Sequence, residues 1–375
     1  MFIEGGSMPR ILYLINSFNS GGAERGILSL IDTGFFEGTY LELVAIHKGE
    51  QPILDELEKR DWQGTVHYCS PSEGLTIKAM IKADFYILGR LVKTNPKFLM
   101  LSLTQSNLIG RCLAIFFPKL KVISFEHSTN FSKKIYTLLL KHLSWRVNYC
   151  FYDNILTYRA MQKSIYYKNS KAIGMYIPLH AIPSNTTKKT SYQLGKIPHI
   201  LSVGRLNEQK NYSLAIEAIA ILKNRGIDAQ LSIAGIGEDL KALKDLSEEQ
   251  GISDKINFMG FVSDWISLKD KTDIFLLSSI REGMSIVTVE AMAAGFPVVA
   301  TNVGGIQDYG KDNLNMVKAL SPTAENIANA LEKVIADDKL RKNIGKQAAK
   351  DAYAEFGAEK VGEILKDARQ KVFFS

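Results

Sequence analysis

Short apolar runs alternate along the chain with longer stretches in which apolar residues recur at helical spacing. Each run is bounded by turn-forming residues, a pattern that predicts buried strands separated by helices. A polar stretch at residues 182–198 interrupts this rhythm and indicates a domain boundary. The predicted strands lie at residues 11–15, 41–46, 98–101 and 122–125 before the boundary, and at 200–203, 230–234, 256–259, 274–277 and 298–300 after it.

Strands that alternate with helices favour βαβ units and a parallel sheet. We therefore predict an α/β protein with two Rossmann-like, doubly wound parallel-sheet domains, which fits 375 residues at about 150 residues per domain. The predicted domains span residues 8–184 and 185–357, and a final helical segment spans 358–375. Open parallel sheets bind ligands beyond the carboxyl ends of their strands, so two such domains facing each other would enclose a binding cleft.

Charge and composition narrow the function only slightly. The sequence holds 46 Lys and Arg against 39 Asp and Glu, a net charge of +7 that suits an anionic ligand, an anionic membrane surface or a nucleic acid. No run of five or six like charges and no aromatic–basic recognition motif is present, so we expect no nucleic-acid partner. Three separated cysteines, no apolar signal region and no membrane-spanning stretch favour a cytoplasmic protein.

The segment after the fourth predicted strand of the second domain combines two carboxylates with a helix start. Ser285 is a suitable N-cap for a helix that begins at Ile286, and the amides of the first turn, such as that of Val287, would then be free to bind a phosphate or sugar oxygen. Glu282 precedes this turn and Glu290 lies about one turn inside the helix, where carboxylates suit ribose or hexose hydroxyls. A capped helix with two solvated glutamates is an equally good interpretation of this segment alone.

The same segment resembles the signature of a known enzyme family. Glu282 and Glu290, with seven residues between them and the pair Gly304-Gly305 after them, are similar to the Glu-x7-Glu motif of retaining glycosyltransferases of the GT-B fold, family 4. The resemblance runs nearly end to end, and its other motifs keep the family's order: Gly21-Gly22-Ala23-Glu24-Arg25, Glu126-His127-Ser128, Gly204-Arg205-Leu206 with Lys210-Asn211, Ala234-Gly235-Ile236-Gly237 and Gly260-Phe261-Val262.

The resemblance implies roles for the matched residues. Arg205 and Lys210 would hold the diphosphate of a nucleotide sugar, where fixed cations stabilise the charge that develops on the leaving group. Glu282 would bind the donor hexose and Glu290 the ribose, while His127 would contact the transferred sugar or shape the acceptor side. The further predicted donor-binding residues are Gly22, Gly204, Gly235, Gly283, Met284, Ser285, Ile286 and Val287, with Phe261 and Val262 beside the base, for which uracil is expected.

Some features of this site qualify the resemblance. The alternative for Arg205 and Lys210 is two exposed basic residues in a loop. No Asp-x-Asp pair is available to hold a divalent ion on the diphosphate, so we expect neither a metal nor a cofactor. Met284 stands where the family commonly has Phe, and Ser285 follows it, so the identity of the sugar is the least transferable part of the prediction.

The family resemblance also implies a mechanism and an acceptor class. It implies retention of the anomeric configuration, and a same-face displacement is preferred because no side chain is placed as a nucleophile. Many relatives extend polyprenyl-diphosphate-linked glycans at the membrane, which favours transfer of a hexose or N-acetylhexosamine from a UDP-sugar to a lipid-linked acceptor in bacterial surface polysaccharide or glycoprotein glycan synthesis. By the same analogy, the segment at 358–375 would cross back onto the N-terminal domain.

A basic amphipathic helix is predicted at residues 132–147. Ile135, Leu139 and Leu143 recur every four residues between basic positions that include Lys141, and Trp145 is typical of interfaces. Such a helix could lie on an anionic membrane at the inner face of the cell membrane, although packing of its apolar face onto the sheet is the commoner use of this pattern.

Two other functions fit the same fold. A non-catalytic partner protein would bind a sugar nucleotide without turnover, and a GT-B epimerase would release an altered sugar without glycosylating an acceptor. The presence of both glutamates together with Arg205 and Lys210 favours an active transferase over a non-catalytic protein.

Overall fold

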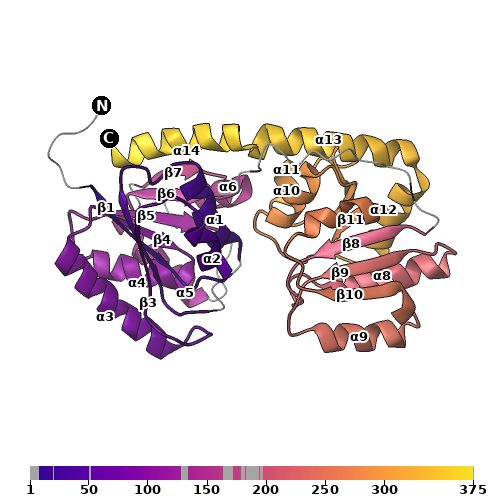
Figure 1. The fold of residues 1–375 in the computed structure, drawn as a ribbon, viewed down its shortest axis with the longest axis horizontal. Helices are drawn as coiled ribbons and strands as arrows, with labels where there is room; N and C mark the ends of the chain where they lie inside the picture. Colours follow the sequence, from indigo (N-terminus) through magenta and orange to yellow (C-terminus); the bar gives the residue numbers. More distant parts are fainter. Residues whose placement is uncertain are drawn as a thin grey trace. The chain divides into compact units, whose positions relative to one another are not determined.

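A computed structural model of the chain describes residues 8–19, 21–49, 52–127, 134–163, 172–178, 182, 194 and 197–374. The chain divides into two units, which we describe separately (Figure 1). Unit 1 comprises Met1–Ala181 and Val361–Ser375, and unit 2 comprises Ile182–Lys360. These divisions lie three residues from the predicted bounds at 184/185 and 357/358. Most of the polar boundary stretch at 182–198 lies outside the described residues.

Unit 1 is built on a parallel sheet, whose strands have the order β3-β2-β1-β4-β5-β6-β7 in the part of the chain that the structure describes. The strands are β1 (Arg10–Ile15), β2 (Tyr40–Ala45), β3 (Gly64–Tyr68), β4 (Phe98–Ser102), β5 (Lys121–Glu126), β6 (Tyr149–Tyr152) and β7 (Ile173–Tyr176). The helices are α1 (Gly22–Asp32), α2 (Pro52–Glu58), α3 (Ile77–Thr94), α4 (Thr104–Ala114), α5 (Lys134–His142), the 3-10 turn η1 (Ser144–Arg146), α6 (Ile155–Lys163) and α14 (Ala358–Phe373).

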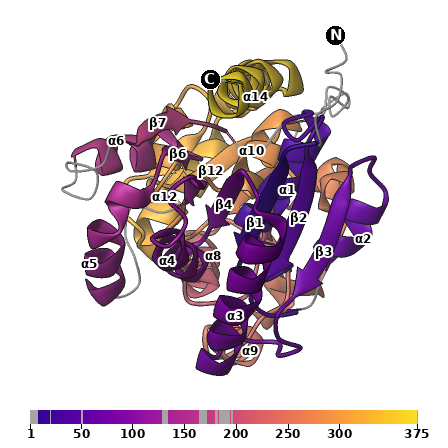
Figure 2. The ribbon, with the colours of Figure 1, turned by 90° about the vertical axis from the view of Figure 1, so that its left-hand side faces the viewer.

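Helices cover both faces of this sheet because alternate residues of each strand point to opposite sides. Ile11 and Tyr13 of β1 face α1, α2 and α14, and Leu365 of α14 is fully buried in that core. Leu12 and Leu14 face the other way, toward α3, α4 and α5. Figure 2 shows both layers of helices around the strands of unit 1. The C-terminal helix therefore supplies part of the core of unit 1, although it is far from β1 in sequence.

Unit 2 has the same design, with a parallel sheet of order β10-β9-β8-β11-β12-β13 among the described residues. The strands are β8 (His199–Val203), β9 (Gln230–Ala234), β10 (Ile256–Gly260), β11 (Ile274–Leu277), β12 (Val298–Thr301) and β13 (Val317–Ala319). The helices are α8 (Tyr212–Asn224), α9 (Leu240–Glu249), η2 (Ser253–Lys255), η3 (Trp265–Lys271), α10 (Ile286–Ala293), α11 (Ile306–Tyr309), α12 (Ala324–Ala336) and α13 (Asp338–Phe356).

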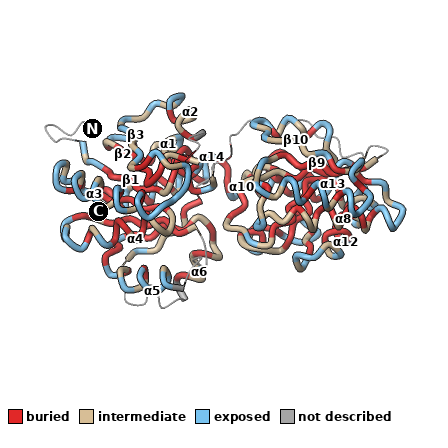
Figure 3. Tube along the Cα trace, turned by 90° about the horizontal axis from the view of Figure 1, so that it is seen from below, coloured by how far each residue is buried: buried red, intermediate tan, exposed pale blue. Residues whose placement is uncertain are grey.

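Two apolar clusters fill unit 2, one on each face of its sheet. Helices α8, α9 and α12 pack on one face, where Ile233 of β9 is fully buried. Helices α10 and α13 pack on the other face, around Phe275 of β11. Figure 3 shows the buried segments running through the middle of each unit, with exposed positions concentrated on the outer helices. The predicted α/β class, with two doubly wound parallel sheets, is confirmed.

Each predicted strand is present, with its ends within one residue of the predicted range. Four further strands escaped prediction, namely β3, β6, β7 and β13. Three of them, β3, β7 and β13, lie at the edges of the two sheets, where strands are short and only partly buried. Such strands lack the continuous apolar run that marks the centre of a parallel sheet.

In each sheet, successive strands are first added on one side of the first strand and then on its other side, and this change of side determines where a ligand can bind. In unit 1 the chain runs outward from β1 to β3 and then returns to β4, so the switch point lies between β1 and β4. In unit 2 the corresponding switch point lies between β8 and β11. Loops that follow these neighbouring strands separate there and leave a crevice at the carboxyl edge of the sheet.

Candidate active site

The loops that follow β8 and β11 meet at the switch point of unit 2. The Ser278 hydroxyl donates to the carbonyl of Lys210 over 2.9 Å, and the Ile280 amide donates to the carbonyl of Gln209 over 3.0 Å. Two segments about seventy residues apart are thereby fixed to each other at the edge of the sheet where a ligand is expected. Arg205, Lys210 and Glu282 all lie in these two loops.

An ion pair joins the two loops. Lys210 Nζ lies 2.7 Å from Glu282 Oε1, and the Ser279 hydroxyl donates to the same oxygen over 2.6 Å. The Glu282 side chain is only 6% exposed and that of Lys210 17%, so the interpretation of Glu282 as a solvated surface glutamate is wrong. An ammonium group has three donors. One of them serves Glu282, and two are available for the oxygens of a phosphate.

Arg205 lies one residue beyond Gly204 and its side chain is exposed. No hydrogen bond or ion pair joins it to another described side chain. A planar guanidinium at this position could grip two oxygens of an anion at once. The loop after β8 thus carries two cations: Lys210, which is fixed by its ion pair with Glu282, and Arg205, which is exposed.

Two glycines allow the loops at this edge to approach one another closely. A Cβ at Gly235 would lie 1.8 Å from the carbonyl oxygen of Gly204, in the neighbouring loop after β8. Gly304 has a φ of +53°, and a Cβ there would lie 2.0 Å from the carbonyl oxygen of Glu282. Both distances are far below van der Waals contact. The loops after β8, β9, β11 and β12 can converge only because these positions carry no side chain.

Helix α10 begins at Ile286, as predicted, but its first turn differs from the prediction. Ser285 has a φ of 58° and its side chain makes no cap hydrogen bond; the hydroxyl instead pairs with Thr288 Oγ1 over 2.9 Å. The Thr288 amide donates to the carbonyl of Ser285 over 3.0 Å, so it is not free for a ligand. The predicted cap is therefore wrong in its chemistry. A non-glycine residue at positive φ is costly and is often retained at a binding site.

The other predicted donor-binding residues of unit 2 occupy several strand ends. Met284 is buried in the core beside α10, and its carbonyl accepts a hydrogen bond from the Tyr309 hydroxyl over 2.8 Å. Its side chain is thus used for packing, and a ligand would meet only its backbone. Phe261 follows β10 and is 68% exposed, as suits a residue that stacks on a planar ring. The remaining ones are Val262 after β10, Gly283 before α10, and Ile286, Val287 and Glu290, all half-buried.

In unit 1, His127 follows β5 and is held by hydrogen bonds on both ring nitrogens. Nε2 lies 2.8 Å from the hydroxyl of Ser102, the last residue of β4, and Nδ1 lies 2.9 Å from Asp153 Oδ2. Burial lowers the pKa of His127, but the hydrogen bond and charge of Asp153, helped by Glu126 and Glu24, raise it more, so the net shift is upward. A protonated imidazole donates from both nitrogens, which suits these partners.

Gly22 begins α1, and its loop lies close to this histidine. Glu24, two residues further on, is buried and contributes to the raised pKa of His127. A Cβ on the neighbouring Gly21 would lie 2.3 Å from Glu24 Oε2. Gly21 thus leaves room for the Glu24 carboxylate. His127 and Gly22, which lie far apart in sequence, belong to one polar region of unit 1; Ser128 lies outside the described residues.

Replacing Asp153 by asparagine should destabilise the protein more in acid than in alkali. Asp153 raises the folded-state pKa of His127, so its stabilisation is fully present below the unfolded pKa of about 6.5 and is lost as the pH rises through the folded value. We expect a clearly larger fall in Tm at about pH 5.5 than at about pH 9. Asp245→Asn, an exposed aspartate on α9, is the matched control, and equal losses at both pH values would contradict the assignment.

Several of these residues were not predicted from the sequence. Asp153 follows β6, a strand of four residues that the apolar pattern did not reveal. Ser102 and Ser279 each stand within two residues of a strand end, but serine is common in loops and gives no signal by itself. Recognition of β6 would have placed Asp153 beside His127, because β5 and β6 are neighbours in the sheet.

The predicted helix at 132–147 is shorter than expected and is interrupted. Residues 132 and 133 lie outside the described residues, α5 ends at His142, and the 3-10 turn η1 follows it. Leu140 is fully buried, whereas Ile135 and Leu139 are exposed. Ile135 and Leu139 belong to the predicted apolar face, so this face does not pack on the sheet. Trp145 is also exposed. Within the described residues, no helix has the length and hydropathy needed to cross a bilayer.

Most of unit 2 matches a family of known proteins. Residues 185–351 match the family model of glycosyl transferases group 1. An uncharacterized glycosyltransferase of Methanocaldococcus jannaschii is 34% identical over 166 residues, which span 44% of this chain and 42% of the relative. The GalNAc-alpha-(1->4)-GalNAc-alpha-(1->3)-diNAcBac-PP-undecaprenol alpha-1,4-N-acetyl-D-galactosaminyltransferase of Campylobacter jejuni is 26% identical over 359 residues, covering 92% of this chain and 94% of that protein.

Solved structures extend the likeness to the whole chain. The crystal structure of Anabaena HepE in complex with UDP superposes with a TM-score of 0.76 at 17% identity, covering 97% of this chain and all of that one. At this identity the likeness shows the fold. Residues 185–351 thus match the family of glycosyl transferases group 1, and the chain has the GT-B fold of two Rossmann-like parallel-sheet domains.

Proposed function

We propose that the protein is a retaining, metal-independent hexosyl- or N-acetylhexosaminyltransferase that uses a UDP-sugar and a polyprenyl-diphosphate-linked glycan in bacterial surface glycan synthesis. The observation that carries the proposal is the Lys210–Glu282 ion pair at the switch point of unit 2, where Ser279 also bonds the carboxylate and Arg205 is exposed in the same loop as Lys210. It supplies cations for a diphosphate and a fixed carboxylate for sugar hydroxyls at one sheet edge.

The donor side follows from the charges in these loops. When the bond between the sugar C1 and the diphosphate oxygen breaks, negative charge grows on the departing phosphate. Lys210 is already oriented by Glu282, so it can stabilise this charge without reorganising. Arg205 adds a second cation that can bind two oxygens. These two positive charges take the part that a divalent ion plays in metal-dependent transferases.

The transfer itself needs only a positioned acceptor. In a same-face displacement, the acceptor hydroxyl oxygen forms a bond to C1 on the face from which the diphosphate departs, and the hydroxyl proton passes to the departing phosphate oxygen. The configuration at C1 is retained, and no protein nucleophile is required. We assign His127 to the sugar or the acceptor. Asp153 holds its protonated ring at Nδ1, and Nε2 would donate to a substrate hydroxyl oxygen in place of the Ser102 hydroxyl that it contacts here.

The choice of uridine and of a lipid-linked acceptor is supported by similar proteins. Anabaena HepE, which shares the fold, is described in complex with UDP, and the Campylobacter jejuni relative is named for an undecaprenol-linked glycan. The exposed Phe261 after β10 is a suitable platform for a pyrimidine ring. The net charge of +7 suits both the anionic donor and an anionic acceptor.

Thermal shift with nucleotides tests the donor. UDP at about one hundred times its Kd should stabilise the protein by about 2.7 kcal/mol, or roughly 5–10 °C in Tm, and should exceed GDP and ADP at the same concentration. The shift should shrink in Lys210→Ala and persist in Lys223→Ala, an exposed lysine that bonds the Gly251 carbonyl. A larger shift with GDP or ADP would contradict the assignment of uridine.

Turnover then separates the transferase from its rivals. A UDP-sugar that gives a large shift is offered with lipid-linked and with soluble acceptors, and the products are analysed by mass spectrometry and NMR. A new α-linkage from an α-donor supports retention. Binding without turnover on any acceptor would indicate a non-catalytic partner protein, and an altered free sugar without a glycosylated acceptor would indicate an epimerase.

A further inference from the structure

Helix α3 of unit 1 carries an exposed apolar stripe that the fold does not use. Ile77, Ile81, Phe85, Leu88 and Val92 recur at intervals of four, four, three and four residues, so they share an arc of about 80° on the helix. Ile77 is 78% exposed, Phe85 73% and Val92 69%. Isolated exposed apolar residues are ordinary, but a continuous stripe along about four turns of one helix indicates an interaction surface.

The stripe cannot turn inward, because another face of α3 already packs on the sheet. Ala83, Ile87 and Leu91 are buried in the core with β1 and β4. Two contacts fix the rotation of the helix: Arg90 donates to Glu42 of β2 over 2.7 Å, and the ring of Tyr86 stacks on His67 of β3 with centroids 4.0 Å apart. The helix therefore has two apolar faces, of which one faces solvent.

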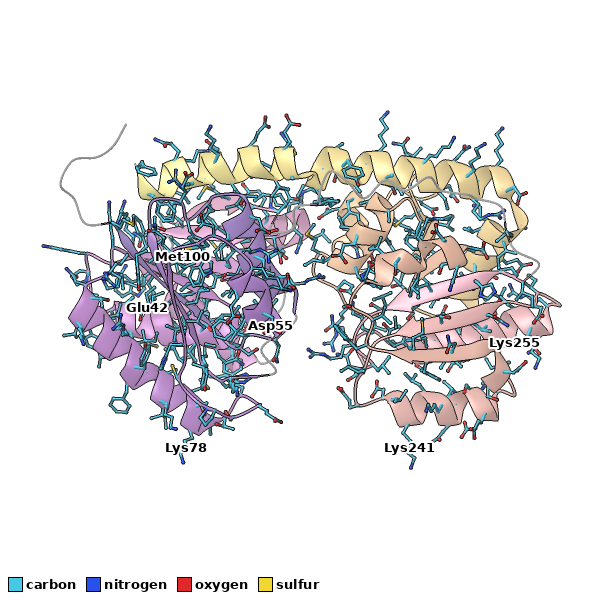
Figure 4. The ribbon with its side chains drawn as sticks, in the orientation of Figure 1. Glu42, Asp55, Lys78, Met100, Lys241 and Lys255 are labelled. Atoms are coloured by element: carbon cyan, nitrogen blue, oxygen red, sulfur yellow. The ribbon has the colours of Figure 1, made fainter. Side chains whose placement is uncertain are left out.

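Lysines border the stripe along one side. Lys78, Lys82 and Lys93 are exposed, and their positions on the helix follow directly after the apolar arc. Figure 4 shows Lys78 pointing away from unit 1. Asp84 is the single acid within α3, and it is half-buried. An apolar stripe flanked by lysines is the arrangement of helices that lie in the headgroup region of anionic bilayers.

We propose that α3 docks unit 1 onto an anionic lipid membrane, with the apolar stripe between the headgroups and the three lysines on lipid phosphates. Charge complementarity favours this occupant: each lysine near an anionic surface adds to binding, whereas an antiparallel second copy of α3 would bring the two lysine rows together. Helix α4 packs beside α3, and Phe116, which follows α4, is a further exposed apolar side chain of unit 1. Figures 1 and 2 both show α3 on the outside of unit 1.

The position of the stripe connects it with the proposed acceptor. In a βαβ unit the helix runs back antiparallel to its strands, so the first turn of α3, at Ile77, lies at the carboxyl edge of the sheet, where His127 also lies. A membrane along α3 would bring lipid-linked molecules to this edge. This part of the inference rests on the proposed function, whereas membrane binding by α3 does not require it.

The test compares binding to vesicles of phosphatidylglycerol and phosphatidylcholine with binding to phosphatidylcholine alone, by co-sedimentation at low and high salt. The wild-type protein should bind the anionic vesicles, and salt should weaken this binding. Ile81→Ser with Phe85→Ser, and separately Lys78→Glu with Lys82→Glu and Lys93→Glu, should each lower vesicle affinity by at least about tenfold. Leu138→Ser with Leu139→Ser, on the exposed face of α5, is the matched control and should retain binding.

Controls keep this inference separate from the proposed function. Both α3 variants change only exposed side chains, so the far-UV circular dichroism, the UDP thermal shift and transfer to a soluble acceptor should stay at wild-type values. If UDP did not raise the Tm of the wild-type protein, the proposed function would be contradicted, whereas membrane binding by α3 would be unaffected. The inference is overturned if wild-type protein ignores anionic vesicles, if the α3 variants bind as well as wild type, or if ultracentrifugation shows a dimer that Phe85→Ser dissociates.

Discussion

Lys210→Ala is expected to lower kcat by about 10²–10³-fold, which corresponds to roughly 2.7–4 kcal/mol of lost transition-state stabilisation. The ammonium group lies 2.7 Å from Glu282 and is mostly buried, so the site loses a cation that was already in place for the leaving diphosphate. The loss should appear in kcat more than in KM, because the charge that Lys210 meets grows as the bond to C1 breaks. Steady-state and single-turnover kinetics with the preferred UDP-sugar measure it.

The control for this variant separates catalysis from folding. Without Lys210, Glu282 keeps the hydroxyl of Ser279 as a partner, so the loop after β11 should remain ordered and the circular dichroism spectrum unchanged. Lys210→Arg retains the charge and should recover part of the activity, while Lys223→Ala, an exposed lysine of α8, should behave as wild type. Near-normal turnover of Lys210→Ala would rule out the assigned role. Arg205→Ala should follow the same pattern, since it removes the second cation.

The centres of both sheets could be predicted from the sequence, because central parallel strands are buried on both faces and read as apolar runs. The run at residues 274–277 is an example, and β11 has these bounds. The edge strand β3 could not be found in this way, since Thr65 and Val66 at its centre are exposed. Strand β6 failed for another reason. It is buried, but its four residues are Tyr, Cys, Phe and Tyr, so it lacks the aliphatic side chains that mark the equally short run at 274–277.

The sequence predicted the residues of the candidate site, but it did not predict which of these residues contact one another. The motifs placed Arg205, Lys210 and Glu282 at strand ends, but no local pattern states that Lys210 would bond Glu282 across 72 residues. That contact depends on the strand order, which brings β8 and β11 together. The cap at Ser285 was mispredicted because propensity describes the preferred chemistry of a position, whereas the backbone at φ 58° turns the hydroxyl toward Thr288.

Gly304→Ala is expected to reduce both stability and activity, because the position permits no side chain. Its φ of +53° disfavours any residue with a Cβ, and that atom would lie 2.0 Å from the carbonyl oxygen of Glu282. Relief of the clash requires the loop after β12 or the loop that carries Glu282 to shift. We expect a loss of about 1–3 kcal/mol in the free energy of unfolding, and a fall of about 100-fold in kcat from misplacement of Glu282 by as little as 1 Å.

Gly362→Ala is the matched control for this prediction. Gly362 lies within α14, and a Cβ placed there would meet no atom within 4 Å other than the adjoining backbone of its own helix. Alanine should therefore raise the free energy of unfolding by about 0.4–1 kcal/mol and leave kcat unchanged. Urea unfolding and steady-state kinetics on both variants give the comparison. If Gly304→Ala kept wild-type stability and turnover, the close approach of the loops after β11 and β12 would have no part in holding Glu282, and the ion pair with Lys210 alone would have to position it.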